Sequence, residues 1–279
     1  MSQDRTKRPA ELDRELRKEA GYGCCRCGKP FIEYHHILGY EVTGHAKDQM
    51  MVLCPECHYL ATVGAIVRDE QYRLKASPFN QERGFALGAL FVTAQDLVVR
   101  MGLNWFVGEG VKIAVDTVSM LSIRKASDGA ITLSTSLYDR GDRLLLELSD
   151  NEWITGDTNM WDMEFKPRWL RLREKRRTVN LIVDARNDRL SVTGVFWKRG
   201  FSVTINDSEI VVGPPIDTHI IGFGFFDGGF SIGAKDGEST IGPIGEGDSK
   251  FLMKPLAGAP TEDALIHDLL EEYHRWRRE

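Results

Sequence analysis

The chain has 279 residues, enough for two domains or for one large domain with an appendage. Hydrophobic residues make up 42% and charged residues 28%, as in an ordinary soluble globular protein. No apolar run reaches the roughly 18 residues of a membrane span, and the N-terminus lacks the apolar core of a secretory signal, so we expect a cytoplasmic protein without membrane association. The net charge of −5 argues against coating of nucleic acid by bulk charge, although a few well-placed cations suffice for phosphate contacts.

The first 20 residues are predicted to form a helix. Strong helix formers and closely spaced opposite charges run from Glu11 to Ala20. Gly21 and Gly23 follow at once, and glycine commonly ends a helix. We therefore expect the helix to stop just before the first cysteines.

A strand, a loop, a second strand and a helix are predicted next. Residues 29–37 have the composition of a short strand, and residues 38–49 are polar and contain glycine, as loops do. Residues 50–53 form a short apolar run that leads into a Cys-Pro-Glu-Cys turn. Residues from His58 to about Val67 suit a helix.

The rest of the chain is predicted to be rich in β-structure. Residues 76–84 are polar with Pro and Gly, which places a boundary there. Residues 85–99 are mostly apolar and fit either a helix or a buried strand. Residues 111–251 consist of short alternating runs, such as Ile131-Thr132-Leu133, separated by turn residues.

One weak internal repeat bears on the β architecture. Residues 196–203 resemble residues 225–232, at an offset of 29. Two copies are compatible with a coiled β-solenoid, although such folds usually show three or more repeats. A sandwich, a barrel and a β-solenoid therefore remain the alternatives.

The predicted fold class is α+β, with a small N-terminal domain in residues 1–80 and a β-rich domain in residues 81–260. Residues 261–279 suit an amphipathic helix capped by Thr261, with acidic residues in its first turn and basic residues in its last. Its apolar stripe, or the β-rich domain itself, offers a surface for a homodimer.

The cysteines indicate a metal site in the N-terminal domain. All five lie between residues 24 and 57, and four of the seven histidines lie in this window or directly after it: His35, His36, His45 and His58. A secreted disulfide framework would spread its cysteines over the fold. Two Cys-x-x-Cys pairs give a four-sulfur tetrahedral shell that favours structural Zn²⁺, with the ligands Cys24, Cys27, Cys54 and Cys57. Cys25 is then spare.

Three of the histidines suit catalysis. His35 and His36 end the predicted strand, and neighbouring strand residues point to opposite faces. A natural division makes one a metal ligand and the other a base. His58 follows the second cysteine pair and, at the start of a helix, can reach the same space.

These residues together resemble a known family. Cys24-x-x-Cys27, then Tyr34-His35-His36-Ile37, then Val52-Leu53-Cys54-x-x-Cys57-His58 are similar in order and spacing to the zinc-containing HNH endonucleases, over residues 14–76. The resemblance implies a ββα-metal fold that holds one catalytic ion, Mg²⁺ or Mn²⁺, with Zn²⁺ or Ni²⁺ as alternatives. It makes His36 the general base that deprotonates the attacking water, and His35 and His58 the ligands of the ion.

One position departs from the family pattern. Gln49 stands where the family has the Asn that orients the base, and the resemblance gives Gln49 that role; His45 and Asp48 are the alternatives. A further helix ligand of the family is replaced here by Thr62, a weak ligand. Water would then fill that place on the ion.

A basic stretch follows in the β-rich domain. Residues 166–177 include seven cations and one acid. The stretch suits a surface that tracks a DNA backbone, and it equally suits an ordinary strand with a solvated cationic face. The candidate nucleic-acid-binding residues are Arg168, Arg171, Arg173, Lys175 and Arg176.

The function predicted from these features is metal-dependent hydrolysis of DNA phosphodiesters, with double-stranded DNA as the expected partner and prokaryotic defence or restriction as the setting. One HNH centre cuts one strand, so a double-strand break needs a dimer or two nicks. Two alternatives stay open. One is a non-catalytic zinc-dependent nucleic-acid-binding protein. The other is a ligand-gated nuclease whose β-rich domain is the sensor.

Overall fold

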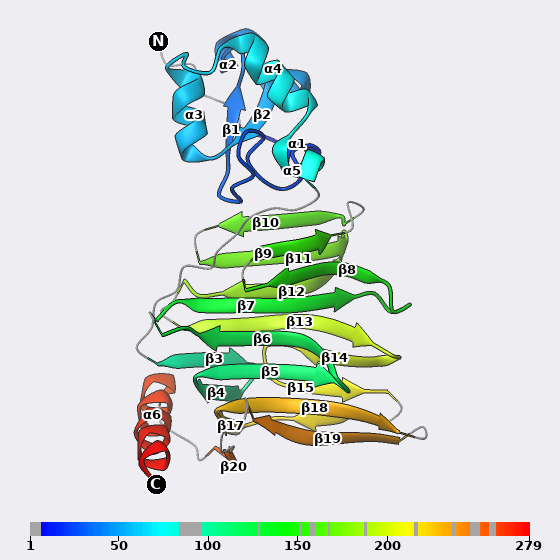
Figure 1. Ribbon diagram of the computed structural model, residues 1–279, viewed down its shortest axis with the longest axis vertical. Coiled ribbons are helices and arrows are strands. Elements are labelled where there is room, and N and C mark those ends of the chain that lie inside the picture. Colours follow the sequence, from blue (N-terminus) through cyan, green and yellow to red (C-terminus); the bar gives the residue numbers. More distant parts are fainter. Residues whose placement is uncertain are drawn as a thin grey trace.

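The computed structural model describes residues 7–83 and 96–279, apart from residues 128, 151, 157–159, 167, 187–188, 215–216, 236–237, 246–251 and 257–260. The chain is a mixed α+β protein. Helices surround a small sheet in the N-terminal region, strands stack in two layers below it, and one helix lies beside the far end of these layers (Figure 1). Most of the segment 85–99 lies outside the described residues.

The N-terminal region has the predicted order of helix, strand, loop, strand and helix. Its elements are α1 (Ala10–Glu19), β1 (Glu33–His36), α2 (Tyr40–Thr43), the 3-10 turn η1 (Lys47–Gln49), β2 (Met50–Leu53), α3 (Pro55–Thr62), α4 (Arg68–Ala76) and α5 (Phe79–Arg83). The expected loop contains two short helical turns. α3 begins at Pro55 rather than at His58, because proline suits the first helical position, where its missing N–H costs nothing.

A small core holds this region together. β1 and β2 pair antiparallel, with His35 opposite Met51 and His36 opposite Met50. All four residues of β2 are buried, and they pack against Leu16 of α1 and Ala61 of α3. A two-stranded sheet of this length is not stable alone. The position of β1, and of the histidines on it, therefore depends on the surrounding helices and cysteines.

The described part of the β region contains eighteen strands. They are β3 (Leu97–Met101), β4 (Asn104–Gly108), β5 (Gly110–Val115), β6 (Val118–Lys125), β7 (Ile131–Tyr138), β8 (Leu144–Ser149), β9 (Glu152–Gly156), β10 (Asp162–Lys166), β11 (Trp169–Lys175), β12 (Thr178–Asp184), β13 (Leu190–Lys198), β14 (Phe201–Ile205), β15 (Ile210–Gly213), β16 (Thr218–Ile220), β17 (Phe223–Phe226), β18 (Gly228–Lys235), β19 (Glu238–Gly245) and β20 (Leu252–Pro255). An eleven-stranded sheet has the order β10-β11-β12-β13-β3-β4-β17-β20, with β14, β15 and β16 branching from β13. The second sheet has the order β19-β18-β5-β6-β7-β8-β9.

The two sheets lie face to face and bury one core between them (Figure 1). Buried and half-buried residues alternate along β7 and along β13, so each sheet turns one face inward. Phe106 and Val192 of one sheet belong to the same core as Ile113 and Leu133 of the other. This is the sandwich alternative. The barrel and the β-solenoid were wrong, because the described strands form two separate sheets that neither close nor coil.

The internal repeat does not produce a structural repeat. Its first copy is the β13–β14 hairpin, which turns at Arg199 and Gly200 within one sheet. Its second copy passes from β17 to β18, which belong to different sheets. Asp227 makes this crossing with a positive φ, and its backbone N–H donates to the carbonyl of Val107. Similar residues therefore serve a hairpin in one place and a sheet crossing in the other.

The N-terminal region contacts the β region at strand β10. The Arg17 guanidinium of α1 bonds both carboxylate oxygens of Asp162 at 2.9 Å, and Arg173 of β11 donates to the same carboxylate at 3.0 Å. The Tyr22 hydroxyl donates to the carbonyl of Met160 at 2.9 Å, and the Tyr22 ring joins the core of the sandwich. The two regions thus share both an ion-pair network and apolar contacts.

The C-terminal helix α6 (Glu262–Arg278) packs against the sandwich. Thr261 caps it, as predicted, by accepting a hydrogen bond from the backbone N–H of Ala264. Leu269 and Tyr273 are buried with Trp105 and Phe226 of the eleven-stranded sheet. The apolar stripe is therefore covered within the chain and does not offer the free surface for self-association that we expected. No helix among the described residues has the length and apolar character needed to cross a membrane.

Candidate metal centre and histidine pocket

The four predicted zinc ligands come together at one end of the β1–β2 sheet. The sulfur atoms of Cys24, Cys27, Cys54 and Cys57 all lie within 4.8 Å of one another. Each Cys-x-x-Cys pair sits in a hydrogen-bonded turn: the Gly28 N–H donates to the carbonyl of Cys24, and the His58 N–H donates to that of Cys54. The prediction of a four-cysteine cluster consistent with structural zinc is confirmed.

The spacing of the sulfurs fits the ion. The Sγ–Sγ distance is 3.7 Å from Cys27 to Cys54 and 3.9 Å from Cys27 to Cys57. Zinc–sulfur bonds of about 2.3 Å in a tetrahedron place the sulfurs about 3.8 Å apart. A hydrogen bond from the thiol of Cys24 is the main cause that lowers the pKa of Cys27, so the cluster favours a thiolate, the form that binds metal.

The fifth cysteine is not a ligand. Cys25 is buried outside the cluster. Its backbone hydrogen bonds with Val52 and Phe79 hold the first Cys-x-x-Cys pair against β2 and α5. Burial raises the pKa of its thiol to about 11. Cys25 is therefore an uncharged core side chain, in agreement with its prediction as the spare cysteine.

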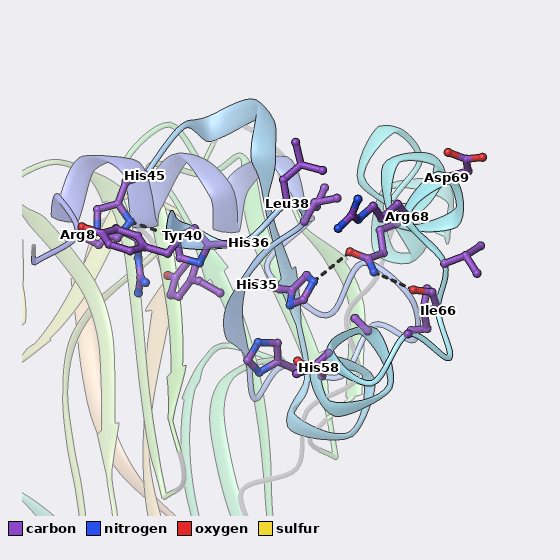
Figure 2. A pocket seen from close by; sticks show the side chains of 18 of the residues that line it. Arg8, His35, His36, Leu38, Tyr40, His45, His58, Ile66, Arg68 and Asp69 are labelled. Atoms are coloured by element: carbon purple, nitrogen blue, oxygen red, sulfur yellow. Dashed lines mark hydrogen bonds between the residues drawn. The ribbon is translucent and has the colours of Figure 1, made fainter. Parts of the chain in front are cut away.

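The three catalytic candidates share one pocket of about 1180 Å³ on the N-terminal region. β1 carries two of them, and Figure 2 shows His35 and His36 on opposite sides of this strand, as alternation along a strand requires. His58 lies on the His35 side, with the two ring centroids 5.1 Å apart. The three predicted histidines therefore line one pocket, with His35 and His58 on one side of β1 and His36 on the other.

His35 has its protonation fixed by a buried amide. Gln71 of α4 donates from Nε2 to the carbonyl of Ile66 at 2.7 Å, so its Oε1 must face His35. His35 Nε2 lies 3.0 Å from this oxygen and donates to it (Figure 2). Burial, and then the charge of His58, lower the pKa of His35. The ring is therefore neutral at physiological pH, and its lone pair lies on Nδ1.

His58 is held in a similar way by a carboxylate. His58 Nδ1 lies 2.5 Å from Glu33 Oε2, and an ionised carboxylate can only accept. In the neutral ring, the proton is thus on Nδ1 and the lone pair on Nε2. Metal-binding histidines almost always donate their other N–H to such an oxygen, which fixes the ring and makes it a better ligand. Both histidines on this side have that arrangement.

His36 lies among aromatic rings on the other side of β1. Its Nε2 is 3.2 Å from Nδ1 of His45. The Tyr40 ring centroid lies 5.6 Å from that of His36 and 4.9 Å from that of His45. Tyr40 and His45 both belong to the segment between β1 and β2 (Figure 2).

Gln49 is not brought together with the histidines. Its amide nitrogen donates to Asp48 at 2.8 Å, its amide oxygen accepts from the Tyr72 hydroxyl, and the residue does not line the pocket. Its backbone carbonyl accepts from the N–H of Ile37, the residue after β1. Thr62 lines the pocket, but its hydroxyl donates to the carbonyl of His58. Neither side chain has the place that the resemblance gave it.

The basic stretch folds as strand β11 and its flanking turns. Trp169, Leu170 and Leu172 are buried, which matches the ordinary-strand alternative. Arg171 donates to Glu164, and Arg173 donates to Glu164 and Asp162. These two guanidinium groups serve ion pairs within the chain rather than forming an open phosphate track.

The other three candidates of this stretch lie at the end of β11 or in the turns beside it. Arg168 has a positive φ of 60° between β10 and β11. Lys175 pairs with Glu174 at 3.1 Å, and Arg176 is exposed in the turn that follows. The structure therefore leaves Lys175 and Arg176 as the solvent-facing cations of the set.

Sequence reasoning missed the partners of the histidines. Glu33 could have been identified from the sequence, because it stands two residues before His35 and so lies on the same face of β1. Gln71 had none, since it comes from α4, 36 residues beyond His35. Among the described residues, only the four cysteines form a group of three or more close metal-binding side chains.

No family model, no curated protein and no solved structure matches the chain. Of the motifs that carried the resemblance, the structure supports the four-cysteine cluster.

Proposed function

We propose that the chain is a metal-dependent endonuclease that hydrolyses DNA phosphodiesters in the histidine pocket. The observation that carries the proposal is the pair formed by His35 and His58. The amide of Gln71 and the carboxylate of Glu33 each take one ring N–H, which leaves one lone pair on each neighbouring imidazole.

His35 Nδ1 and His58 Nε2 are the atoms that would hold the catalytic ion. When bound, the ion stabilises negative charge on the phosphate and on the leaving oxygen. Glu33 is already bonded to His58, so the protein offers two imidazoles and leaves the remaining positions to water and substrate. Imidazole ligands favour Ni²⁺ or Zn²⁺ over Mg²⁺.

His36 is the proposed general base. It lies across β1 from the metal-binding pair and lines the same pocket. Histidine titrates near neutral pH, so a neutral ring can take a proton from the attacking water at physiological pH. The division of labour follows from the alternation of side chains along one strand.

The cations of the pocket favour an anionic substrate. Lys7, Arg8 and Arg68 line it. Arg8 pairs with Asp13 and lies 4.0 Å over the Tyr34 ring, so its position is fixed. Arg68 is exposed at the start of α4, and the described residues give it no ion-pair partner. We assign Arg68 to binding of a substrate phosphate.

A second candidate is a nuclease regulated through its β region. Arg17, which bonds Asp162 of β10, also donates to the Tyr34 hydroxyl at 2.8 Å. Tyr34 is the residue before His35 on β1. Movement of β10 would therefore be transmitted to the catalytic strand. This candidate predicts that Asp162→Asn in the full chain changes the rate of DNA cleavage, whereas an unregulated nuclease predicts an unchanged rate.

Cleavage of supercoiled plasmid tests the proposed function. The zinc-loaded full chain should nick plasmid only when Mn²⁺, Mg²⁺, Ni²⁺ or further Zn²⁺ is added. His36→Ala should lower the rate by about 10²–10⁴-fold, the usual contribution of a general base. His267→Ala is the matched control, because His267 lies exposed on α6 and should leave the rate unchanged. Plasmid that stays intact with every ion would contradict the proposal.

A further inference from the structure

The segment between β1 and β2 presents a second histidine to the proposed base. His45 Nδ1 lies 3.2 Å from His36 Nε2, and the ring centroids are 5.4 Å apart. Figure 2 shows both rings on the same side of β1, with Tyr40 beside them. The side chain of Gln49 is turned to Asp48 and Tyr72 instead.

We propose that His45 is the positioning residue of the general base, in the role for which HNH endonucleases use an Asn. The inference rests on the proposed nuclease function. It assigns the role to the segment before η1 and removes it from Gln49, the residue at the corresponding sequence position.

The hydrogen bond between the two rings has one arrangement that suits a base. His36 needs a lone pair to take a proton from water. If His45 donated to His36 Nε2, the lone pair of a neutral His36 would be consumed by that bond. If His36 Nε2–H donates to His45 Nδ1, the lone pair of His36 is on Nδ1. His45 thus selects the tautomer as well as the orientation of the ring.

The backbone around His45 is well fixed. Gly44 has a positive φ of 55°, and its N–H donates to the Tyr40 carbonyl at 2.7 Å. The Thr43 hydroxyl donates to the carbonyl of Gly39 at 3.2 Å, and Ala46 N–H donates to the carbonyl of Thr43. A positioning residue acts only if its own place is fixed, and these turns on both sides of His45 supply that.

The decisive variants are His45→Ala and His45→Asn. Asparagine carries Oδ1 on Cγ, the place that Nδ1 has in histidine, so it can still accept from His36 Nε2–H. We expect His45→Ala to lower kcat by about 10–100-fold with KM nearly unchanged, because the base is misplaced and DNA binding is not. His45→Asn should recover most of the loss, and Gln49→Ala should lose less than His45→Ala.

Three controls separate this role from a merely structural one. All variants should keep one zinc per chain and their melting temperature, and His267→Ala should match the wild type. A second readout needs no catalysis: in the wild-type chain, ¹⁵N NMR should detect a scalar coupling across the N–H···N bond between the His36 and His45 rings.

The outcomes are distinct. Equal kcat for His45→Ala and wild type, a loss in His45→Asn as large as in His45→Ala, or absence of the coupling would overturn the positioning role while leaving the nuclease intact. Wild-type protein that cuts no plasmid would overturn the nuclease itself, and the positioning role would fall with it even if the coupling were seen.

Discussion

The N-terminal region and the β region are stabilised in opposite ways. In the N-terminal region, four cysteines within a window of 34 residues form one cluster consistent with structural zinc, and the apolar core around β2 is small. In the β region, pairings such as Leu190 with Val99 and Gly224 with Trp105 join distant parts of the chain across a large common core. A zinc ion in this cluster would concentrate stability at one point in the first region, whereas stability is distributed over many side chains in the second.

This difference separates the roles of the two regions. A metal-centred fold can place reactive histidines on short elements with little core to support them. A large sandwich supplies a rigid edge, here β10, against which the small region rests. The predictions below perturb one region and read the other.

Loss of zinc should have the largest effect. Structural zinc contributes about 10–16 kcal/mol in small zinc domains, more than the folding stability of most domains. Cys54→Ser should therefore release the zinc and unfold the N-terminal region, while the β region keeps its structure. Amide hydrogen exchange resolved by region, with zinc analysis, measures both.

Cys25→Ala is the matched control, since Cys25 lies outside the cluster. It should retain one zinc per chain and the protection of β1 and β2. If Cys54→Ser lost its amide-exchange protection in both regions at once, the stability of the β region would not be independent of the cysteine cluster.

A core truncation in the β region should have the next largest effect. Phe106 is fully buried and stacks on Phe225 with ring centroids 4.4 Å apart. Phe106→Ala should cost about 3–5 kcal/mol and lower the Tm by roughly 6–20 °C, with the zinc content unchanged. Leu103→Ala, at a position 48% exposed, should change the free energy of unfolding by less than about 0.5 kcal/mol. A similar Tm for both variants would contradict the assigned core.

The contact between the regions should respond less. Asp162 is 1% exposed and bonds both Arg17 and Arg173. Asp162→Asn removes the negative charge from both hydrogen bonds. It should lower the free energy of unfolding, measured in urea, by about 2 kcal/mol. Glu70→Gln breaks only the exposed pair with Arg73 and should lower the free energy of unfolding by less than Asp162→Asn does, because solvent screens an exposed ion pair. Equal losses would mean that the buried network does not join the regions.

The pH dependence of the same contact should be the smallest effect. Burial alone would raise the pKa of Glu164, but the hydrogen bond from Arg171 and the charges of Arg17 and Arg173 outweigh it and leave that pKa below its ordinary 4.5. The stability from Glu164 is therefore complete above about pH 4.5 and is lost as the pH falls through the folded-state pKa. Glu164→Gln should show a shallower loss of stability in acid than wild type. Parallel pH curves from urea unfolding would contradict this assignment.

Sequence reasoning worked where the determinants are local. The cluster could be predicted from the spacing of Cys24, Cys27, Cys54 and Cys57, because one turn is enough to bring the two sulfurs of each pair together. The order of β1, β2 and α3 followed from short-range patterns in the same way. The four-cysteine cluster was therefore predictable residue by residue.

It failed where distant residues meet. The repeat at residues 196 and 225 suggested similar units, but one copy turns within a sheet and the other crosses between sheets. Arg171 and Arg173 had the composition of a DNA-binding surface, but their ion pairs with Glu164 and Asp162 keep them within the chain. Pairings of this kind depend on packing that no local pattern contains.

Binding of Mn²⁺ to the zinc-loaded chain, measured by electron paramagnetic resonance, tests the central claim most directly. We expect one Mn²⁺ site beyond the structural zinc. His58→Ala should weaken this site at least about tenfold, and His36→Ala should leave it unchanged, because His36 lies across β1 from the pair. Absence of a second site, or equal affinity in wild type and His58→Ala, would contradict the assignment of the histidine pocket as a catalytic metal site.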